Sequence, residues 1–142
     1  NGRNPIVAHE YLGDSVEGKD VFVADDIIAS GDSILDLAYN LKKRKAKRVF
    51  AGATFAFFTS GLDAFDKAYA DGVIDHVFAT NLTYTPQAVL DRPWFSQADM
   101  SKYMAFVIAT LNHDQSLSYL LNPWNRIEKL LTKYRAEHPC ND

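Results

Sequence analysis

Two kinds of segment alternate along this chain, and the alternation constrains its fold more than any other feature. Short apolar runs, rich in β-branched and aromatic residues, predict strands over 21–24, 48–55 and 76–81. Between these runs, apolar residues recur at helical spacing over 33–41 and 62–69. Strands that alternate with helices predict an α/β fold, in which helices cover both faces of a parallel sheet.

The remaining segments extend this pattern. No repeat, low-complexity tract or internal linker divides the 142 residues. We therefore expect a single domain over 1–142, with 122–142 as a C-terminal helical extension. The other predicted elements are a strand over 6–12, a proline-bearing connection over 82–96 and helices over 100–111 and 125–134.

Composition limits the classes of protein to which the chain can belong. Apolar residues make up 47% of it, enough for one core. No apolar run reaches the ~20 residues that span a bilayer. The net charge of −3 argues against attraction to nucleic acid or a membrane surface. Cys140 is the only cysteine, so no internal disulfide can form and a reducing, cytoplasmic location is expected. Because residue 1 is not Met, we expect a piece of a longer polypeptide.

The segment DDIIASGDS, residues 25–33, is the strongest candidate for a binding site. In open α/β sheets, ligands bind beyond the carboxyl ends of the strands, and Asp25 and Asp26 follow the predicted strand 21–24. Residues 29–33 then form the turn into a helix, where free backbone N–H groups and the positive end of the helix dipole favour an anion. Their small side chains let the backbone close on a phosphate.

The two acids call for a different ligand group. Carboxylates repel phosphate, but they suit sugar hydroxyls and a Mg²⁺ ion that keeps several of its waters. A phosphate group at one end and a diol at the other describe a ribose phosphate. Each hydrogen bond to a charged group contributes roughly 1.5–3 kcal/mol, so a few would anchor the anion.

The same segment also fits an ordinary helix start. In that interpretation Ser30 or Asp32 caps the helix, as small polar residues commonly do. Two neighbouring acids at the end of a buried strand repel each other, however, and a bound cation or ligand is the usual compensation. The pair Asp25 and Asp26 therefore favours binding over capping alone.

Several ordered segments resemble one family. DDIIASGDS is similar to the loop that binds ribose 5-phosphate in type I phosphoribosyltransferase folds. From about residue 7 to residue 121 the chain resembles ribose-phosphate pyrophosphokinase, also called PRPP synthetase. This resemblance implies a phosphoribosyltransferase-type parallel sheet flanked by helices. The segments that carry it are VEGKDVFVADD (16–26), KRKAKRVFAGATFAFFTSG (43–61), VIDHVFATN (73–81) and HDQSLSYLL (113–121).

The resemblance implies a role for each residue of the loop. Asp25 and Asp26 would hold the ribose hydroxyls and a Mg²⁺ shell. The ribose 1-hydroxyl would attack the β-phosphorus of ATP, giving PRPP and AMP. Such phosphoryl transfer needs positioning and charge neutralisation rather than a nucleophilic side chain. The residues that would surround the 5-phosphate are Ala29, Ser30, Gly31, Asp32 and Ser33.

The resemblance also implies parts outside the loop. The family completes its ATP site with an upstream homologous half, so this chain would be the C-terminal half and would lack the N-terminal one. A mobile Lys/Arg loop neutralises the migrating diphosphoryl group in the family, and Arg3 lies in roughly that region. We therefore expect a homo-oligomeric enzyme whose isolated C-terminal half binds ribose 5-phosphate without turnover.

Three residues depart from the family pattern. Ala29 stands where the family commonly has Asp, so one polar contact is missing. Asp32 stands where the family commonly has Gly, and its carboxylate must point away from a phosphate. Phe55 stands where the family often has His after Thr54.

Two other functions remain open at this stage. One is a phosphoribosyltransferase that consumes PRPP, although no segment resembles a hood for recognition of a base. The other is a non-catalytic, PRPP-binding regulatory module.

Two further groups of residues have a structural and a functional interpretation. The basic run over 42–48 could suggest nucleic acid, but cations at a helix end complement its dipole, and the chain as a whole is acidic. The aromatic residues over 55–58 favour core or interface packing, although a nucleotide base could stack there. Trp94, Phe95 and Trp124 are predicted to anchor C-terminal segments or to meet another subunit.

Overall fold

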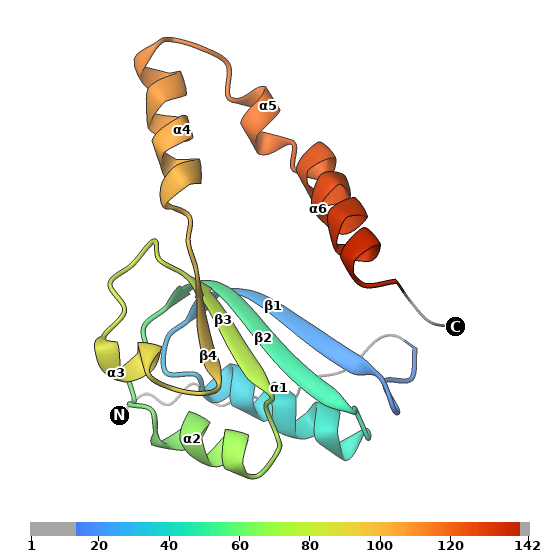
Figure 1. Ribbon diagram of the computed structural model, residues 1–142. Helices are drawn as coiled ribbons and strands as arrows, with labels where there is room; N and C mark the ends of the chain where they lie inside the picture. Colours follow the sequence, from blue (N-terminus) through green and yellow to red (C-terminus); the bar gives the residue numbers. More distant parts are fainter. Residues whose placement is uncertain (1–13, 140–142) are drawn as a thin grey trace. The chain divides into compact units, whose positions relative to one another are not determined.

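The structure is a computed structural model that describes residues 14–139. The chain divides into two compact units, Asn1–Met100 and Ser101–Asp142 (Figure 1). The strand predicted over 6–12 and the candidate residue Arg3 lie outside the described residues. The division does not decide whether 1–142 is one domain with a helical extension over 122–142, so that stays a prediction.

Unit 1 is built on a parallel sheet of four strands in the order β1-β2-β3-β4 (Figure 1). The strands are β1 (Asp20–Ile28), β2 (Arg48–Ala56), β3 (His76–Thr80) and β4 (Phe95–Ala98). Within residues 14–139, each strand pairs only with its neighbours in sequence, and each of these pairings is parallel. The prediction of an α/β fold with a parallel sheet flanked by helices is confirmed.

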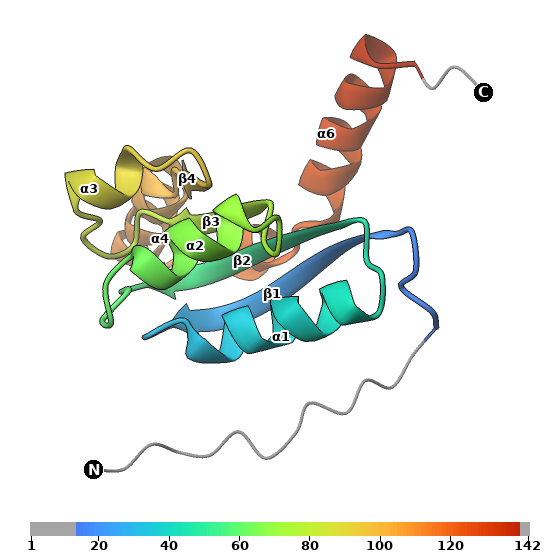
Figure 2. The same cartoon turned by 90° about the horizontal axis from the view of Figure 1, so that it is seen from below.

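The two longer helices of unit 1 lie on the same face of the sheet. They are α1 (Asp32–Lys43), between β1 and β2, and α2 (Asp63–Ala70), between β2 and β3 (Figure 2). Because the strand order runs in one direction and crossovers share one hand, consecutive helices fall on one side. Within residues 14–100 this differs from the expectation that helices cover both faces.

The core of unit 1 lies between this helical layer and the sheet. Helix α1 contributes apolar residues at positions spaced by three and four, as a helix that buries one stripe must. The residues with the smallest exposed fractions come from the helices, from the strands and from the connections between them. They include Ile28, Ala38, Val49, Phe65, Ala68, Ile74, Val77 and Trp94.

The expectation that Trp94 and Phe95 anchor C-terminal segments or meet another subunit is wrong. Both side chains are buried in the core of unit 1. The Trp94 ring stacks on Phe65 at 5.3 Å between centroids, and its Nε1–H donates to a carboxylate oxygen of Asp66 at 2.7 Å. A tryptophan that satisfies its one donor in this way is fully accommodated inside the fold.

The connection expected over 82–96 has structure of its own. It contains the single turn α3 (Gln87–Leu90) and the start of β4. Strand β4 is only four residues long, too short for its alternation to stand out in the sequence. Its backbone pairing with β3, from Val77↔Phe95 to Thr80↔Ala98, defines it.

The opposite face of the sheet carries exposed aromatic rings. Phe22 of β1 is 60% exposed, and its ring lies 6.4 Å from that of Phe78 on β3. The strand between them carries Gly52, where a Cβ would come within 2.5 Å of the Phe22 ring. The absence of a side chain at Gly52 therefore lets the Phe22 ring lie across β2.

Unit 2 consists of three helices. They are α4 (Ser101–Asn112), α5 (Ser118–Leu121) and α6 (Trp124–Glu137), and α4 and α6 confirm the helices predicted over 100–111 and 125–134. The Tyr103 hydroxyl donates to the Leu120 carbonyl at 3.4 Å, and the Arg126 guanidinium lies 5.8 Å from the Tyr103 ring centre. None of the helices in the described part of the chain has the length and apolar character needed to span a bilayer.

Candidate functional site

The candidate acids lie inside β1 rather than after it. The sequence predicts a strand over 21–24, but parallel pairing with β2 continues to Ile28↔Ala56. Asp25 pairs with Ala53, so both acids lie in the last part of the strand, at the carboxyl edge of the sheet. This is the edge at which open α/β sheets bind ligands.

The strands change their pattern of burial beside these acids. Every second residue of β2 is buried from 49 to 53, but the next buried residue is Ala56. Ile28, which pairs with Ala56, is also buried. The alternation of buried and less buried residues therefore shifts by one position at the level of Asp25 and Asp26. Local irregularities of strands are over-represented next to active sites.

Both carboxylates are accessible, and no cation of residues 14–139 compensates their charge. Asp25 and Asp26 are exposed, and neither forms an ion pair with any residue of the described chain. One oxygen of Asp25 accepts the backbone N–H of Asp26 at 2.8 Å. The other carboxylate oxygens are available to a ligand.

The acids fit the part of a Mg²⁺ shell that a protein normally supplies. Within residues 14–139, no three His, Cys, Asp or Glu side chains form a cluster that could hold a metal ion alone. Mg²⁺ does not require such a cluster, because it is usually bound by one or two carboxylates together with waters and substrate phosphates. Asp25 and Asp26 provide those carboxylates.

An open cavity of about 280 Å³ lies beside Asp25 at the ends of the neighbouring strands. The Thr80 hydroxyl donates to the Thr54 carbonyl at 2.6 Å and ties the ends of β3 and β2 together. Among the residues that line the cavity, sequence reasoning identified Asp25 and missed the others, although the positions of several at the carboxyl ends of predicted strands could have indicated them. The lining residues are Asp25, Gly52, Ala53, Thr54, Phe78, Ala79, Thr80 and Ala98.

Gly31 allows the loop after β1 to turn tightly into α1. Its φ of 93° lies in the left-handed region, which residues with a Cβ rarely adopt. A Cβ at this position would also overlap the buried ring of Phe65 on α2. Gly31 thus satisfies a backbone and a packing requirement, and the loop rests directly on the core.

The N-cap residue of α1 is Gly31, which has no side chain, so neither Ser30 nor Asp32 holds the N-cap position. The Ser30 hydroxyl accepts only the N–H of Asp32, the first residue of the helix. The N–H groups of the first turn have no acceptor within their own helix, as at every α-helix N-terminus. They and the positive end of the dipole are directed at the loop of residues 29–33.

Asp32 and Ser30 are hydrogen-bonded to each other. The Ser30 hydroxyl donates to a carboxylate oxygen of Asp32 at 3.1 Å, and the Asp32 N–H donates to the same hydroxyl at 3.3 Å. The departure from the family pattern at Asp32 is thereby accommodated within the loop. Its consequence is that Ser30 already uses its proton, whereas the exposed Ser33 is the better hydroxyl donor for an anion.

The chain after β2 supports the loop from one side. The Thr59 N–H donates to the Ala29 carbonyl at 2.9 Å, and the Phe57 N–H donates to the Ile28 carbonyl at 2.8 Å. The side chain of Phe57 is 49% exposed and stacks on Phe55 with 6.5 Å between ring centres. This pair is accessible, whereas the third aromatic residue of the segment, Phe58, is buried in the core.

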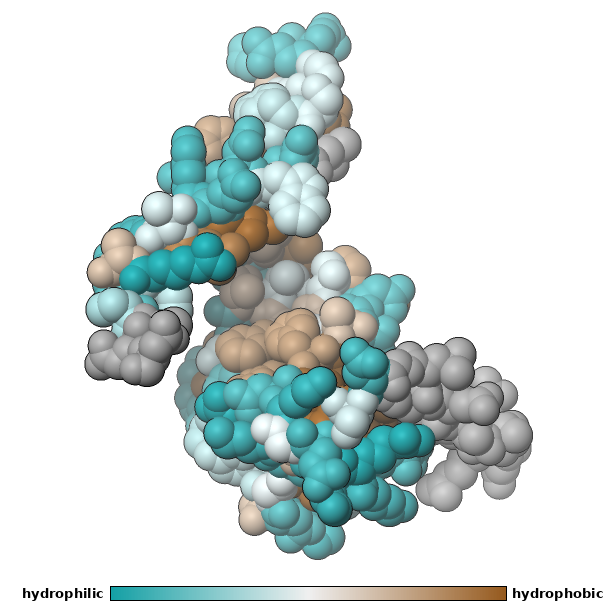
Figure 3. Space-filling view, turned by 90° about the vertical axis from the view of Figure 1, so that its right-hand side faces the viewer, coloured by the Kyte–Doolittle hydropathy of each residue, from teal (hydrophilic) through white to brown (hydrophobic). Residues whose placement is uncertain are grey.

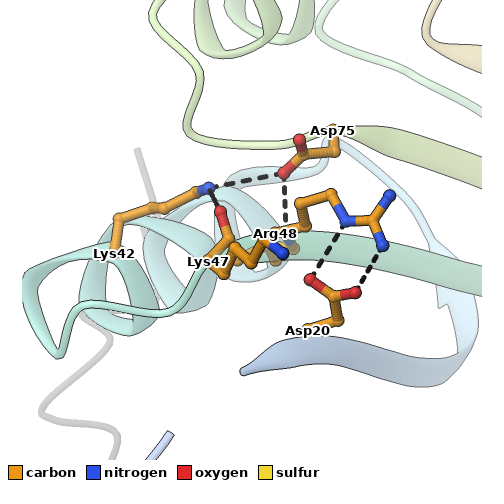
Figure 4. A network of polar contacts seen from close by, with 6 residues as sticks. Asp20, Lys42, Lys47, Arg48 and Asp75 are labelled. Atoms are coloured by element: carbon orange, nitrogen blue, oxygen red, sulfur yellow. Dashed lines mark hydrogen bonds and ion pairs between the residues drawn. The ribbon is translucent and has the colours of Figure 1, made fainter. Parts of the chain in front are cut away.

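The basic run over 42–48 lies at the other edge of the sheet and binds acids of the chain (Figure 4). Lys42 Nζ donates to the Lys47 carbonyl at 2.8 Å and pairs with an Asp75 carboxylate oxygen at 3.4 Å. The same oxygen accepts the Val49 N–H at 2.8 Å. Asp75 therefore links the end of α1 to the starts of β2 and β3.

Two more acids at this edge are paired in the same way. Arg48, the first residue of β2, binds Asp20, the first residue of β1, through both carboxylate oxygens (Figure 4). The hydrogen bond from Arg48 lowers the pKa of Asp20, and the same hydrogen bond raises the pKa of Arg48. Lys45 pairs with Glu17 at 2.8 Å. This use of the cations agrees with the structural interpretation of the basic run.

Comparisons with known proteins agree with this geometry. Residues 5–122 match the family model described as the phosphoribosyl synthetase-associated domain. A ribose-phosphate pyrophosphokinase of Vibrio cholerae is 35% identical over 111 residues, which are 78% of this chain and 34% of the relative. Phosphoribosyl pyrophosphate synthase-associated protein 2 of Homo sapiens is 33% identical over 105 residues, 74% of this chain and 28% of the relative.

A solved structure shares the fold. The crystal structure of phosphoribosylpyrophosphate synthetase from Mycobacterium smegmatis matches with a TM-score of 0.61 at 22% identity, over 72% of this chain and 33% of that one. This chain thus spans about a third of the length of the relatives that it matches.

Proposed function

Because the chain belongs to the phosphoribosyl synthetase-associated domain family, we propose that it is the C-terminal part of a ribose-phosphate diphosphokinase. In this proposal the carboxyl edge of unit 1 binds ribose 5-phosphate, and later PRPP, together with Mg²⁺. The whole protein transfers the diphosphoryl group of ATP to the ribose 1-hydroxyl, giving PRPP and AMP. The N-terminal half needed for the ATP site is supplied by the rest of the polypeptide.

One observation carries the proposal. Asp25 and Asp26, which form no ion pair within residues 14–139, lie on the same short segment as the N-terminus of α1, whose N-cap residue Gly31 has no side chain. An unpaired acid pair is unfavourable without a ligand, and so are helix amides without acceptors. A phosphorylated pentose with Mg²⁺ satisfies both ends at once.

Each part of the segment has a separate task in the proposed reaction. Asp25 and Asp26 orient the ribose hydroxyls and hold part of the Mg²⁺ shell. The Ser33 hydroxyl and the first-turn amides of α1 hold the 5-phosphate at a fixed distance from the acids. Mg²⁺, when bound, neutralises charge on the phosphates. Phosphoryl transfer gains most of its rate from such positioning and charge stabilisation.

A second candidate is a non-catalytic module that binds the same ligand. The match to a synthase-associated protein favours it, because that relative is named as an associate of the enzyme. Asp32 favours it as well, since the Ser30–Asp32 hydrogen bond places a carboxylate and an engaged hydroxyl in the phosphate loop. Such a module would bind ribose 5-phosphate or PRPP but would not form AMP.

The test separates binding from turnover. Calorimetric titration of the 142-residue chain with ribose 5-phosphate and Mg²⁺ is expected to show saturable binding that Asp25→Asn with Asp26→Asn abolishes. Ribose without the phosphate serves as the control ligand and is expected to bind far more weakly. Absence of saturable binding would contradict the proposed site.

The full-length polypeptide decides between the two candidates. Ribose 5-phosphate and ATP should give AMP with the full-length protein and none with the isolated chain. Binding without AMP formation by the full-length protein would favour the regulatory module. Robust turnover by the isolated chain would contradict the proposal that it needs an N-terminal half for catalysis.

A further inference from the structure

Helix α6 lies outside the part of the chain that matches the family, since the family model ends at residue 122. Its large apolar side chains are all exposed, with fractions from 40% to 69%, and Figure 3 shows hydrophobic residues at the surface of unit 2. At about 100° per residue, they fall within an arc of about 120° that contains no polar side chain of the helix. These residues, the apolar stripe of α6, are Trp124, Ile127, Leu130, Leu131 and Tyr134.

The rest of unit 2 contacts the other side of this helix. Arg126, whose guanidinium packs on the Tyr103 ring, lies outside the arc of the apolar stripe. The cavity in unit 2 is lined by α6 through polar residues, namely Asn125, Arg126 and Lys129. Unit 2 therefore leaves the apolar stripe uncovered. A helix of 14 residues is marginal in water on its own, so a partner that covers the stripe would stabilise it.

The charge of α6 is opposite in sign to that of the whole chain. The helix carries four cations and two acids, a net charge of +2, whereas the 142 residues together carry −3. Lys133 pairs with Glu137 at 3.8 Å, so Glu128 is the one acid of the helix left to offset the other cations. The argument from net charge against a membrane surface therefore applies to the chain as a whole but not to this helix. The cations of α6 are Arg126, Lys129, Lys133 and Arg135.

A lipid surface fits this combination better than a second copy of the helix. Helices that lie in a membrane interface combine an apolar face bearing Trp and Leu with Lys and Arg on the polar face. Trp124 and Tyr134, at the two ends of the stripe, belong to the residue types enriched at the level of the lipid headgroups. A second copy placed antiparallel over the stripe would instead bring the two Glu128 carboxylates together, and this repulsion opposes association.

We propose that α6 binds an anionic lipid surface, with its apolar stripe among the acyl chains and its cations close to the anionic headgroups. The helix lies in the plane of the interface, since no helix in the described part of the chain is long and apolar enough to span a bilayer. Both the buried apolar area and the charge contribute to binding by such a helix. The binding is therefore reversible, and it strengthens with the fraction of anionic lipid.

The two tryptophans of the chain make the test specific. Trp124 is 68% exposed, whereas Trp94 is fully buried in unit 1, so binding of α6 to lipid removes only Trp124 from water. Titration of the 142-residue chain with vesicles of equal parts phosphatidylcholine and phosphatidylserine is expected to shift the tryptophan emission to shorter wavelength. Vesicles of phosphatidylcholine alone are expected to bind more weakly. Trp124→Phe keeps an apolar ring and is expected to lose the shift but still to sediment with the vesicles.

Two variants separate the contributions of the stripe and the charge. Leu130→Gln with Leu131→Gln is expected to weaken vesicle binding about tenfold or more, because two exposed apolar side chains no longer enter the acyl region. Lys129→Gln with Arg135→Gln is expected to weaken binding to the phosphatidylserine vesicles roughly tenfold. Lys43→Gln with Lys47→Gln is the matched control, since it removes the same charge from exposed residues of the basic run, and it is expected to have no effect.

Other outcomes overturn the proposal. A chain that neither sediments with the phosphatidylserine vesicles nor changes its emission has no such surface. Binding that survives Leu130→Gln with Leu131→Gln, or that the control variant weakens as much as Lys129→Gln with Arg135→Gln does, belongs to another part of the chain. Self-association without lipid that Leu130→Gln with Leu131→Gln abolishes would assign the stripe to a second copy. Circular dichroism of each variant verifies that the chain remains folded.

Discussion

The acidic side chains at the two edges of the sheet in unit 1 differ in whether they are ion-paired. At the amino edge, Asp20 and Asp75 are paired with cations of the basic run. At the carboxyl edge, Asp25 and Asp26 have no cation within the described chain, and the helix beside them begins at an N-cap residue, Gly31, that has no side chain. The carboxylates at the amino edge are thus neutralised by cations of the chain. Those at the carboxyl edge remain available to a ligand. This difference is the reason for proposing the carboxyl edge as the binding site.

The largest expected effect is on binding at the carboxyl edge. Asp25→Asn with Asp26→Asn should weaken ribose 5-phosphate binding in Mg²⁺ about 100-fold or more, because carboxylate contacts to the hydroxyls and metal are lost. The stability of the chain should stay the same or rise, since the repulsion between the acids is removed. Calorimetry and urea unfolding measure the two quantities.

A matched variant removes the same charge from the other edge. Glu17→Gln with Asp20→Asn should leave ribose 5-phosphate affinity unchanged and lower stability slightly, because both acids are ion-paired there. Equal losses of affinity in the two double variants would remove the distinction between the edges.

The next effect concerns the turn that shapes the phosphate loop. Gly31→Ala should cost about 2 kcal/mol or more of stability and abolish phosphate binding, because it combines a strained φ with overlap of the Phe65 ring. Gly18→Ala provides the control, since Gly18 has a φ of 71° but no atom near its missing Cβ. Chemical denaturation of both variants isolates the contribution of packing, and equal losses would show that packing contributes nothing.

A smaller effect is expected for the polar link at the amino edge. Asp75→Ala should destabilise the chain by roughly 1–2 kcal/mol, because the Val49 N–H loses its acceptor and the Lys42 ammonium keeps only the Lys47 carbonyl. Asp75→Asn keeps an oxygen for Val49 and should cost less. Urea midpoints measure both, and ribose 5-phosphate affinity should be unchanged in either variant.

The smallest effect is a dependence of stability on pH. Because Arg48 lowers the pKa of Asp20 in the folded chain below its ordinary value of 3.8, this pair stabilises the fold above that pH. Its contribution is lost as the pH falls through the lowered pKa. The pair is exposed, so the effect is small and salt-sensitive. Stability curves of the original chain and Asp20→Asn should converge on acidification; parallel curves would contradict this.

The sequence predicted the elements with strong local signals. The β-branched run before Asp25 and the helical spacing after Ser33 were sufficient to place β1, α1 and the candidate loop between them. The resemblance to PRPP synthetase gave the family, which the comparisons confirm. It also gave roles for individual residues, and these stay predictions.

What the sequence could not predict depends on long-range pairing and packing. The extension of β1 to Ile28 follows from its register with β2, and β4 exists because β3 offers it a partner. Trp94 seemed free to anchor another segment because nothing in its neighbours reveals the stacking partner Phe65, far away along the chain. Neither Ser30 nor Asp32 is the N-cap residue, because Gly31, with its positive φ, takes that position, and Ser30 accepts only the Asp32 N–H.

The most direct test of the central claim follows the backbone amides by NMR during titration with ribose 5-phosphate and Mg²⁺. The ligand is an anion, so unspecific attraction would take it to the basic residues over 42–48. The account predicts saturable shifts at residues 25–34, at the carboxyl edge, and none at the basic run. Shifts confined to the basic run, with residues 25–34 unchanged, would contradict it.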